Sequence, residues 1–209
     1  MLLADPAYVV PPPGPPGPFG TLAWLRATVS RFSEGETHAR RRAIVEALLA
    51  ELDPAQLRER ARRADYELPK PYIPVAVLAE ALGATDVPAA VEAVRTVAAA
   101  YHPGTDAPGA DDALRRLLAL LPDGEPEHVA QRVAILVQAC EATAALVRGA
   151  LERPVEEMLR ETPPVPVTRR LSPAGEVVTV PLAGHPFGAG PRRCPGEAHA
   201  RALVEGVVG

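Results

Sequence analysis

Cysteine is scarce in this sequence of 209 residues, which contains only Cys140 and Cys194. Two cysteines cannot form the disulfide framework that stabilises small secreted domains. The first residues, MLLADPAYVV, lack the cationic segment of a secretory leader, and no uninterrupted apolar run reaches membrane-spanning length. We therefore expect a cytoplasmic protein without a membrane partner.

An excess of basic residues is also lacking. The chain has 22 Lys and Arg residues against 26 Asp and Glu residues, a formal net charge of -4. It has no arginine-rich stripe with interleaved aromatic residues, the pattern typical of nucleic-acid binding, so nucleic acid is not an expected partner. Hydrophobic residues make up 47% of the sequence, which is enough to bury one substantial core.

Proline, in contrast, is abundant, with 25 residues that mostly mark the boundaries of expected elements. The segment VVPPPGPPGP, residues 9–18, is the exception and predicts an extended, polyproline-like conformation. We expect residues 1–18 to form a Pro-rich arm on the surface and residues 19–209 to form a single domain.

Most of the remaining sequence shows the three-to-four spacing of apolar residues that indicates helices, and GTLAWLRATVSRFS, residues 20–33, is one of these predicted helices. The segment EPEHVAQRVAILVQACEATAALVRGAL, residues 125–151, is apolar on nearly all sides in its middle, which predicts a central buried helix. The segments VPVTRRL and EVVTVPL flank a Ser-Pro-Ala-Gly turn and predict a β-hairpin. The expected fold class is mainly α with one small β-hairpin or sheet.

One loop, GHPFGAGPRRCPGEAHARAL at residues 184–203, sets a single cysteine directly before a helix. A loop thiolate that binds a metal needs glycines for close approach, N–H dipoles for the sulfur charge, and a cation for an anionic group of the cofactor. The residues at fixed spacing around Cys194 are Phe187, Gly188, Gly190, Arg192 and Gly196. The alternative, a surface turn with an incidental thiol, is disfavoured by this spacing.

This loop resembles the proximal haem-binding signature of the cytochrome P450 superfamily, and the resemblance implies a haem b cofactor. Cys194 falls on the axial thiolate that binds the haem iron. Phe187 falls on the aromatic residue beside the sulfur, and Arg192 falls on a cation that meets a haem propionate. Gly188, Gly190 and Gly196 lie within the same signature, so we assign all these residues to cofactor binding.

Two upstream segments resemble further parts of the superfamily. In ETHARRRAIV, His38 and Arg42 match a helix that clamps the propionates, although the pair alone is typical of a solvated basic helix face. EMLRETPPVPVTRRL resembles the Glu-x-x-Arg helix, the Pro-Pro turn and the strand whose arginine, here Arg169, reaches a propionate. By themselves, Glu157 and Arg160 would be an ordinary helix ion pair.

The segment AILVQACEATAALV resembles the long helix that crosses the oxygen-binding face in this superfamily. Ala139 falls on the expected small residue and Glu141 on the acid, which implies that Glu141 handles protons. Ala142 occupies the position of the usual threonine, and Thr143 should point about 100° away around the helix. Thr143 is then either a catalytic residue or a side chain that bonds to a backbone carbonyl.

The resemblance covers most of the chain in order but leaves only residues 87–122 for the helices that roof a substrate pocket. It implies a trimmed cytochrome P450-like fold with an exposed haem, which a homodimer would cover. The implied function is a haem-thiolate enzyme that acts on a small organic or natural-product substrate, by peroxide-type oxidation or a redox-neutral step. Ala142 disfavours conventional monooxygenation. The alternatives are a non-catalytic haem-binding protein and a module that stabilises a partner enzyme.

Overall fold

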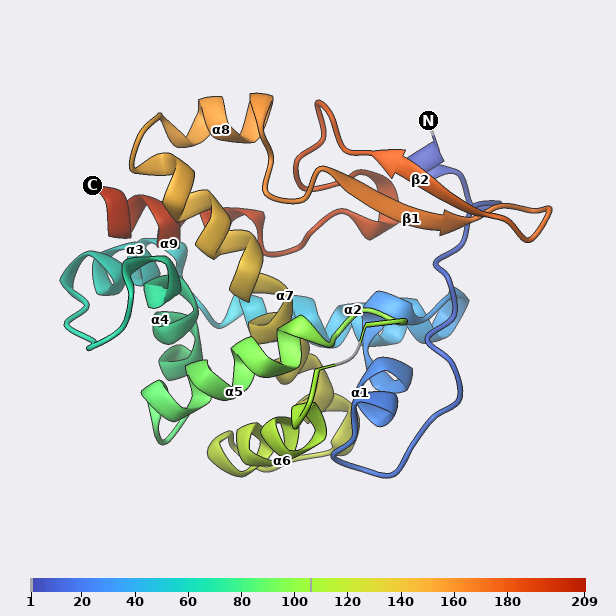
Figure 1. The fold of residues 1–209 in the computed structure, drawn as a ribbon, viewed down its shortest axis with the longest axis horizontal. Coiled ribbons are helices and arrows are strands. Elements are labelled where there is room, and N and C mark those ends of the chain that lie inside the picture. The colour runs from blue at the N-terminus through green and yellow to red at the C-terminus, as the bar shows by residue number, and fades with distance from the viewer. Residues whose placement is uncertain (1, 106) are drawn as a thin grey trace.

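The computed structural model describes residues 2–105 and 107–209, and helices make up most of it (Figure 1). The α-helices are α1 (Leu22–Thr28), α2 (Gly35–Ala50), α3 (Pro54–Arg63), α4 (Ile73–Ala81), α5 (Val87–Ala99), α6 (Ala110–Leu120), α7 (Pro126–Ala150), α8 (Val155–Glu161) and α9 (Glu197–Val208). The short 3-10 helices are η1 (Leu2–Ala4), η2 (Ser30–Phe32), η3 (Lys70–Tyr72) and η4 (Gly190–Arg192). Strands β1 (Val167–Leu171) and β2 (Val177–Pro181) pair antiparallel. The predicted fold class, mainly α with one small hairpin, is confirmed.

Local signals in the sequence explain where several helices begin. The Asp53 side chain accepts a hydrogen bond from the Ala55 amide at 2.9 Å, and the Asp86 side chain accepts one from the Ala89 amide at 3.0 Å. Each aspartate thereby satisfies an amide that a helix start leaves without a partner. The expected helix over residues 20–33 is divided into α1 and η2, because Val29 between them adopts an extended conformation.

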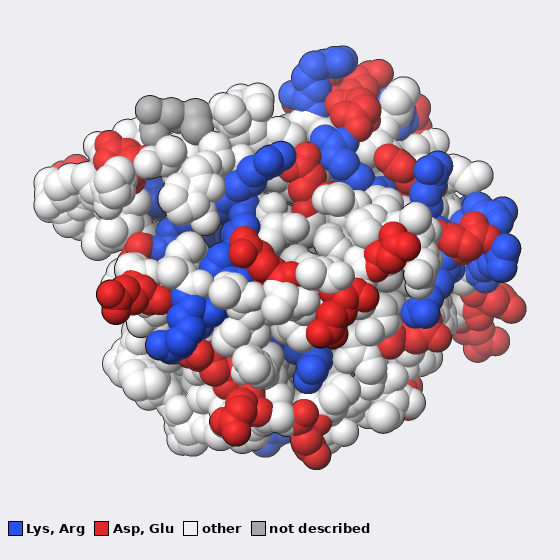
Figure 2. Space-filling view, turned by 180° about the vertical axis from the view of Figure 1, so that it is seen from behind, with Lys and Arg blue, Asp and Glu red and all other residues white. Residues whose placement is uncertain are grey.

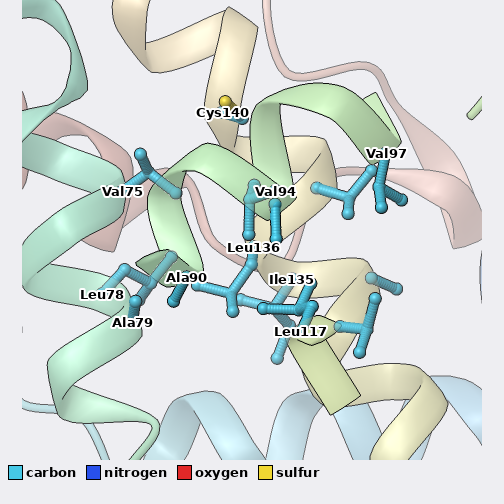
Figure 3. Packing of buried hydrophobic residues seen from close by; sticks show 14 of the residues in the cluster. Val75, Leu78, Ala79, Ala90, Val94, Val97, Leu117, Ile135, Leu136 and Cys140 are labelled. Atoms are coloured by element: carbon cyan, nitrogen blue, oxygen red, sulfur yellow. The ribbon is translucent and has the colours of Figure 1, made fainter. Parts of the chain in front are cut away.

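The hydrophobic core is built around α7, as the sequence predicted. Helices α4, α5 and α6 pack against α7, and their apolar side chains converge there (Figure 3). Ala79 and Ala90 have no exposed surface, and their small side chains let the neighbouring backbones approach closely. The labelled members of this core are Val75, Leu78, Ala79, Ala90, Val94, Val97, Leu117, Ile135, Leu136 and Cys140.

Helix α7 is long and apolar enough, by length and composition only, to cross a membrane. Its apolar residues do not form an uninterrupted run, because Gln138 and Glu141 lie in its middle. In the structure 56% of the most apolar stretch of α7 is buried inside the protein, which fits the core helix of a soluble protein.

On the face opposite to the one in Figure 1, basic and acidic side chains are interspersed (Figure 2).

Helix α9, which follows the Cys194 loop, is fixed by close packing on α3. Gly206 allows this approach, because a Cβ atom there would collide with the carbonyl oxygen of Arg58 and lie 2.9 Å from the Ala61 side chain. The start of the chain contacts the hairpin through backbone hydrogen bonds. Val9 exchanges two backbone hydrogen bonds with Leu171, so the N-terminal segment extends the sheet by one bridge.

A buried amide holds η2 against α7 and gives a first prediction. The Gln131 side chain has no exposed surface, accepts from the Ser30 amide at 2.9 Å and donates to the Thr28 carbonyl at 2.9 Å. Gln131→Leu leaves these buried groups without partners, so we expect the free energy of unfolding to fall by about 2–4 kcal/mol. Urea denaturation measures this loss.

The matched control is Gln56→Leu, because Gln56 lies exposed on α3. We expect that variant to change the free energy of unfolding by less than about 0.5 kcal/mol. Equal effects of the two substitutions would contradict the role given to Gln131.

Candidate functional site

A cavity of about 310 Å³ lies between α2, α7, α9, the hairpin and the Cys194 loop. Its volume is at the lower end of the range of ligand pockets, roughly 300–1,000 Å³. Helix α2 contributes one stripe of its surface, formed by His38, Arg42, Val45 and Leu49. Among the described residues, neither α5 nor α6 contributes to the lining.

Helix α7 forms a second wall of the cavity. The lining residues at helical spacing on this wall are Ile135, Gln138, Ala139, Ala142, Thr143 and Leu146. The short side chains of Ala139 and Ala142 leave space on the cavity side of the helix. Thr143 is 3% exposed, and its hydroxyl donates to the Ala139 carbonyl at 2.9 Å, so its proton is held by the backbone.

The loop before α9 presents Cys194 to the cavity. The Cys194 amide donates to the Phe187 carbonyl at 2.8 Å, which closes the loop. Gly188 has a φ of 73°, a left-handed conformation that side chains disfavour, so the tight turn depends on glycine. The Cys194 residue is exposed, yet desolvation by the surrounding protein atoms raises the pKa of its thiol, whereas the Gly196 amide and the Arg42 charge oppose this shift.

Three of the predicted clamp residues, His38, Arg42 and Arg192, line this cavity. Arg42 forms an ion pair with Glu46 at 2.7 Å and donates to the Arg193 carbonyl at 2.7 Å. Arg192 pairs with Glu34 and donates to the Ser33 carbonyl, both at 2.6 Å. Burial and the Arg192 charge lower the pKa of His38, which favours the neutral imidazole at pH 7.

Solved structures share this arrangement of the chain. The cytochrome P450 CYP164A2 of Mycobacterium smegmatis superposes with a TM-score of 0.71 at 19% identity, over 99% of this chain and 79% of that chain. P450BioI, solved in complex with hexadec-9Z-enoic acid ligated acyl carrier protein, gives a TM-score of 0.68 at 13% identity, over 99% and 80% of the two chains. This chain has a cytochrome P450-like fold.

A third structure of this fold is the cytochrome P450 enzyme CxnD, described for C–S bond formation in chuangxinmycin biosynthesis. It gives a TM-score of 0.62 at 15% identity, over 99% of this chain and 75% of CxnD. No protein-family model matches the chain, and the search of curated proteins gave no match. The P450-like fold is thus detected through structure, at identities too low for the sequence searches.

The predicted proton-handling residue, Glu141, is not among the described residues that line the cavity. Glu141 is two residues from both Ala139 and Thr143, so it lies about 200° from each around α7. It is exposed, its carboxylate accepts from the Tyr72 hydroxyl at 3.4 Å, and the same carboxylate lies 3.9 Å from the Cys140 sulfur. Neither of these two partners lines the cavity.

The two arginines on β1 face different sides of the hairpin. Successive residues of a strand face opposite sides, and here Arg169 is exposed whereas Arg170 is 4% exposed and lines the cavity. Arg170 donates to the Thr168 hydroxyl and to the Arg169 carbonyl, both at 3.0 Å, and within the described residues it forms no ion pair. The cavity is thus lined by Arg170 and not by Arg169, the residue that the sequence analysis selected.

Gly190, which the sequence analysis assigned to cofactor binding, is not among the described residues that line the cavity. A Cβ atom at Gly190 would lie 2.9 Å from the Ala4 side chain, so this glycine lets η1 pack on the loop.

The helix ion pair considered for Glu157 and Arg160 is not found among the described residues. Glu157 lies 3.8 Å from Arg153, and Arg160 pairs with Glu161 at 2.9 Å.

Of the lining residues that sequence reasoning did not assign to the site, three carry basic side chains: Arg31, Arg170 and His199. The alternation of β1 could have identified Arg170, but Arg31 lies in η2 and belongs to no motif. The His199 Nε2 atom lies 2.9 Å from the carbonyls of Leu49 and Leu52, and its Nδ1 atom is buried without a partner. His199 thereby joins the end of α2 to α9 beside the cavity.

Proposed function

We propose that this chain binds haem b through Cys194 and acts as a haem-thiolate enzyme on a small organic or natural-product substrate. The observation that carries the proposal is the composition of one cavity. It is lined by a cysteine on a glycine loop and by the arginines Arg31, Arg42, Arg170 and Arg192, and among its described lining residues there is no Asp or Glu.

This composition fits haem, which carries two propionate groups. A cation that is buried without an anion costs several kcal/mol, so a site of this kind favours an anionic ligand. Burial lowers the pKa of Arg170, and the charges of Arg31 and Arg192 lower it further. The propionates would relieve this repulsion, with His38, Arg42, Arg170 and Arg192 as their partners.

Haem bound to a thiolate supplies an iron centre whose reactivity the sulfur increases. The protein's own residues would hold and orient it. The Gly196 amide and the Arg42 charge stabilise the thiolate form of Cys194. Ala139 and Ala142 keep the α7 wall free of bulky side chains, so a flat ligand and a small substrate could lie against it.

The choice of reaction follows from what the α7 wall offers for proton transfer. The Thr143 hydroxyl is bound to the Ala139 carbonyl, Ala142 has no hydroxyl, and Glu141 lies outside the cavity. Conventional monooxygenation depends on timed proton delivery. We therefore favour peroxide-type oxidation or a redox-neutral step, in which His38 or His199 would hold the proton.

The comparisons support the proposed substrate class. CxnD, which shares the fold, is described in the biosynthesis of chuangxinmycin, and P450BioI is in complex with a ligated acyl carrier protein. No described residue of α5 or α6 lines the cavity, so these helices do not cover it. We therefore still predict that a second copy of the chain covers it in a homodimer. A non-catalytic haem-binding protein is the alternative, and it would need the same clamp and the same cysteine.

The proposal predicts haem binding through sulfur. Purified protein reconstituted with haem, reduced and exposed to carbon monoxide should show the strongly red-shifted Soret band of a thiolate-ligated carbonyl. Cys194→Ala should lose this band because it removes the ligand, whereas Cys140→Ala should keep it because Cys140 lies in the core. A reconstituted wild type without the band would refute the proposal.

The corrected clamp predicts different effects for two neighbouring arginines. Arg170→Gln should weaken haem binding by about tenfold or more, because a buried charge-assisted hydrogen bond contributes roughly 1.5–3 kcal/mol. Arg169→Gln makes the same change of charge on the exposed face of β1 and should alter binding less than about twofold. Haem transfer to apomyoglobin measures both variants, and a larger effect of Arg169→Gln would restore the original assignment.

The proposed reaction class predicts which oxidant is effective. With styrene as a small apolar probe, hydrogen peroxide should support more epoxide formation than reductase, NADPH and air. Cys194→Ala is the control for haem that reacts without the thiolate. Efficient turnover, tightly coupled to NADPH and absent with peroxide, would show that conventional monooxygenation operates despite Ala142.

A further inference from the structure

Arg31 is a further cation that lines the cavity. It lies in η2 and is half-buried. Arg42 and Arg192 each have a carboxylate and a backbone carbonyl as partners. Within the described residues the Arg31 guanidinium makes neither an ion pair nor a hydrogen bond, and its nearest described interaction is with the Phe32 ring, 5.7 Å from the ring centroid.

The proposed contacts of haem do not use Arg31. The two propionates would meet His38, Arg42, Arg170 and Arg192, which come from α2, β1 and the Cys194 loop. Arg31 comes from a different segment and adds a further positive charge. Because a partly buried cation without an anion is costly, Arg31 favours one more anionic group at its side of the cavity.

We propose that Arg31 binds the carboxylate of an apolar organic acid, and that this acid is the substrate class of the site. The inference rests on the proposed function, since the acid would lie beside the cofactor. The planar guanidinium matches the geometry of a carboxylate and binds it with two parallel hydrogen bonds. The apolar part of the acid would contact Ile135, Ala139 and Leu146 on the α7 wall.

The test compares two ligands of nearly equal shape, 4-phenylbutyrate and 4-phenylbutyramide. Each is titrated into the haem-reconstituted protein, and the shift of the Soret band gives its Kd. We expect the wild type to bind the carboxylate at least about tenfold more tightly than the amide. Arg31→Gln should reduce this ratio to about twofold or less.

The matched control is Arg95→Gln, which removes the same charge from an exposed position on α5 over the Tyr72 ring. It should keep the preference of the wild type for the carboxylate. An unchanged preference in Arg31→Gln would overturn the proposal, as would an equal loss in Arg95→Gln.

A second measurement separates this role from binding of a propionate. Arg31→Gln should retain both haem and haem dimethyl ester as well as the wild type does. If Arg31→Gln loses haem but keeps the dimethyl ester, Arg31 belongs to the propionate clamp and the proposal is wrong.

Calorimetry of the haem-free protein with the same two ligands keeps this inference distinct from the proposed function. If the protein fails to bind haem but shows an Arg31-dependent preference for the carboxylate, the anion site stands and the proposed function fails. If the protein binds haem and no Arg31-dependent preference is seen in either form, the anion site fails and the proposed function stands.

Discussion

The arrangement of this protein depends on helix α7, which must serve the core and the cavity at the same time. Its sides that face α4, α5 and α6 bury Val133, Leu136 and Cys140, which have no exposed surface. Another side carries Ala139, Ala142 and Thr143 toward the cavity. Because the helix repeats about every 3.6 residues, an insertion of one residue would move cavity residues into the core. The same packing that stabilises the fold therefore fixes which residues the ligand would meet.

The cavity concentrates positive charge that the protein itself does not neutralise. The carboxylates that pair with Arg192 and Arg42, Glu34 and Glu46, are 44% and 56% exposed, so solvent weakens these two ion pairs. Arg31 and Arg170 are the cavity arginines without an ion pair among the described residues. Such a concentration of charge is costly when the cavity is empty, so an anion that bound there would also stabilise the fold.

The sequence predicted features that depend on local pattern and missed those that depend on the direction of a side chain. Periodicity identified the buried helix over residues 125–151 and the hairpin, and the spacing around Cys194 identified the loop that reaches the cavity. Arg169 was chosen over Arg170 because a motif does not tell which face of a strand turns inward. Glu141 was assigned by its order along the chain, whereas its rotation around α7 decides its contacts.

Arg31 shows a different limit of sequence reasoning. It lies in a segment predicted as part of one continuous helix, and only the break at Val29 and the hydrogen bond from Ser30 to Gln131 bring it to the cavity. That hydrogen bond joins residues 101 positions apart, so no local sequence pattern contains it. The tertiary packing of η2 on α7 creates this part of the site.

The short chain also changes how a ligand can be selected. Helices α5 and α6 occupy the sequence between α4 and α7, yet their apolar faces pack into the core and they contribute no described lining residue. A site with few walls discriminates poorly by shape, because an extra methylene group meets no barrier. Directional contacts to charged groups then carry more of the selectivity. For this reason the arginines of the cavity, rather than its volume, would determine which molecules bind in a productive orientation.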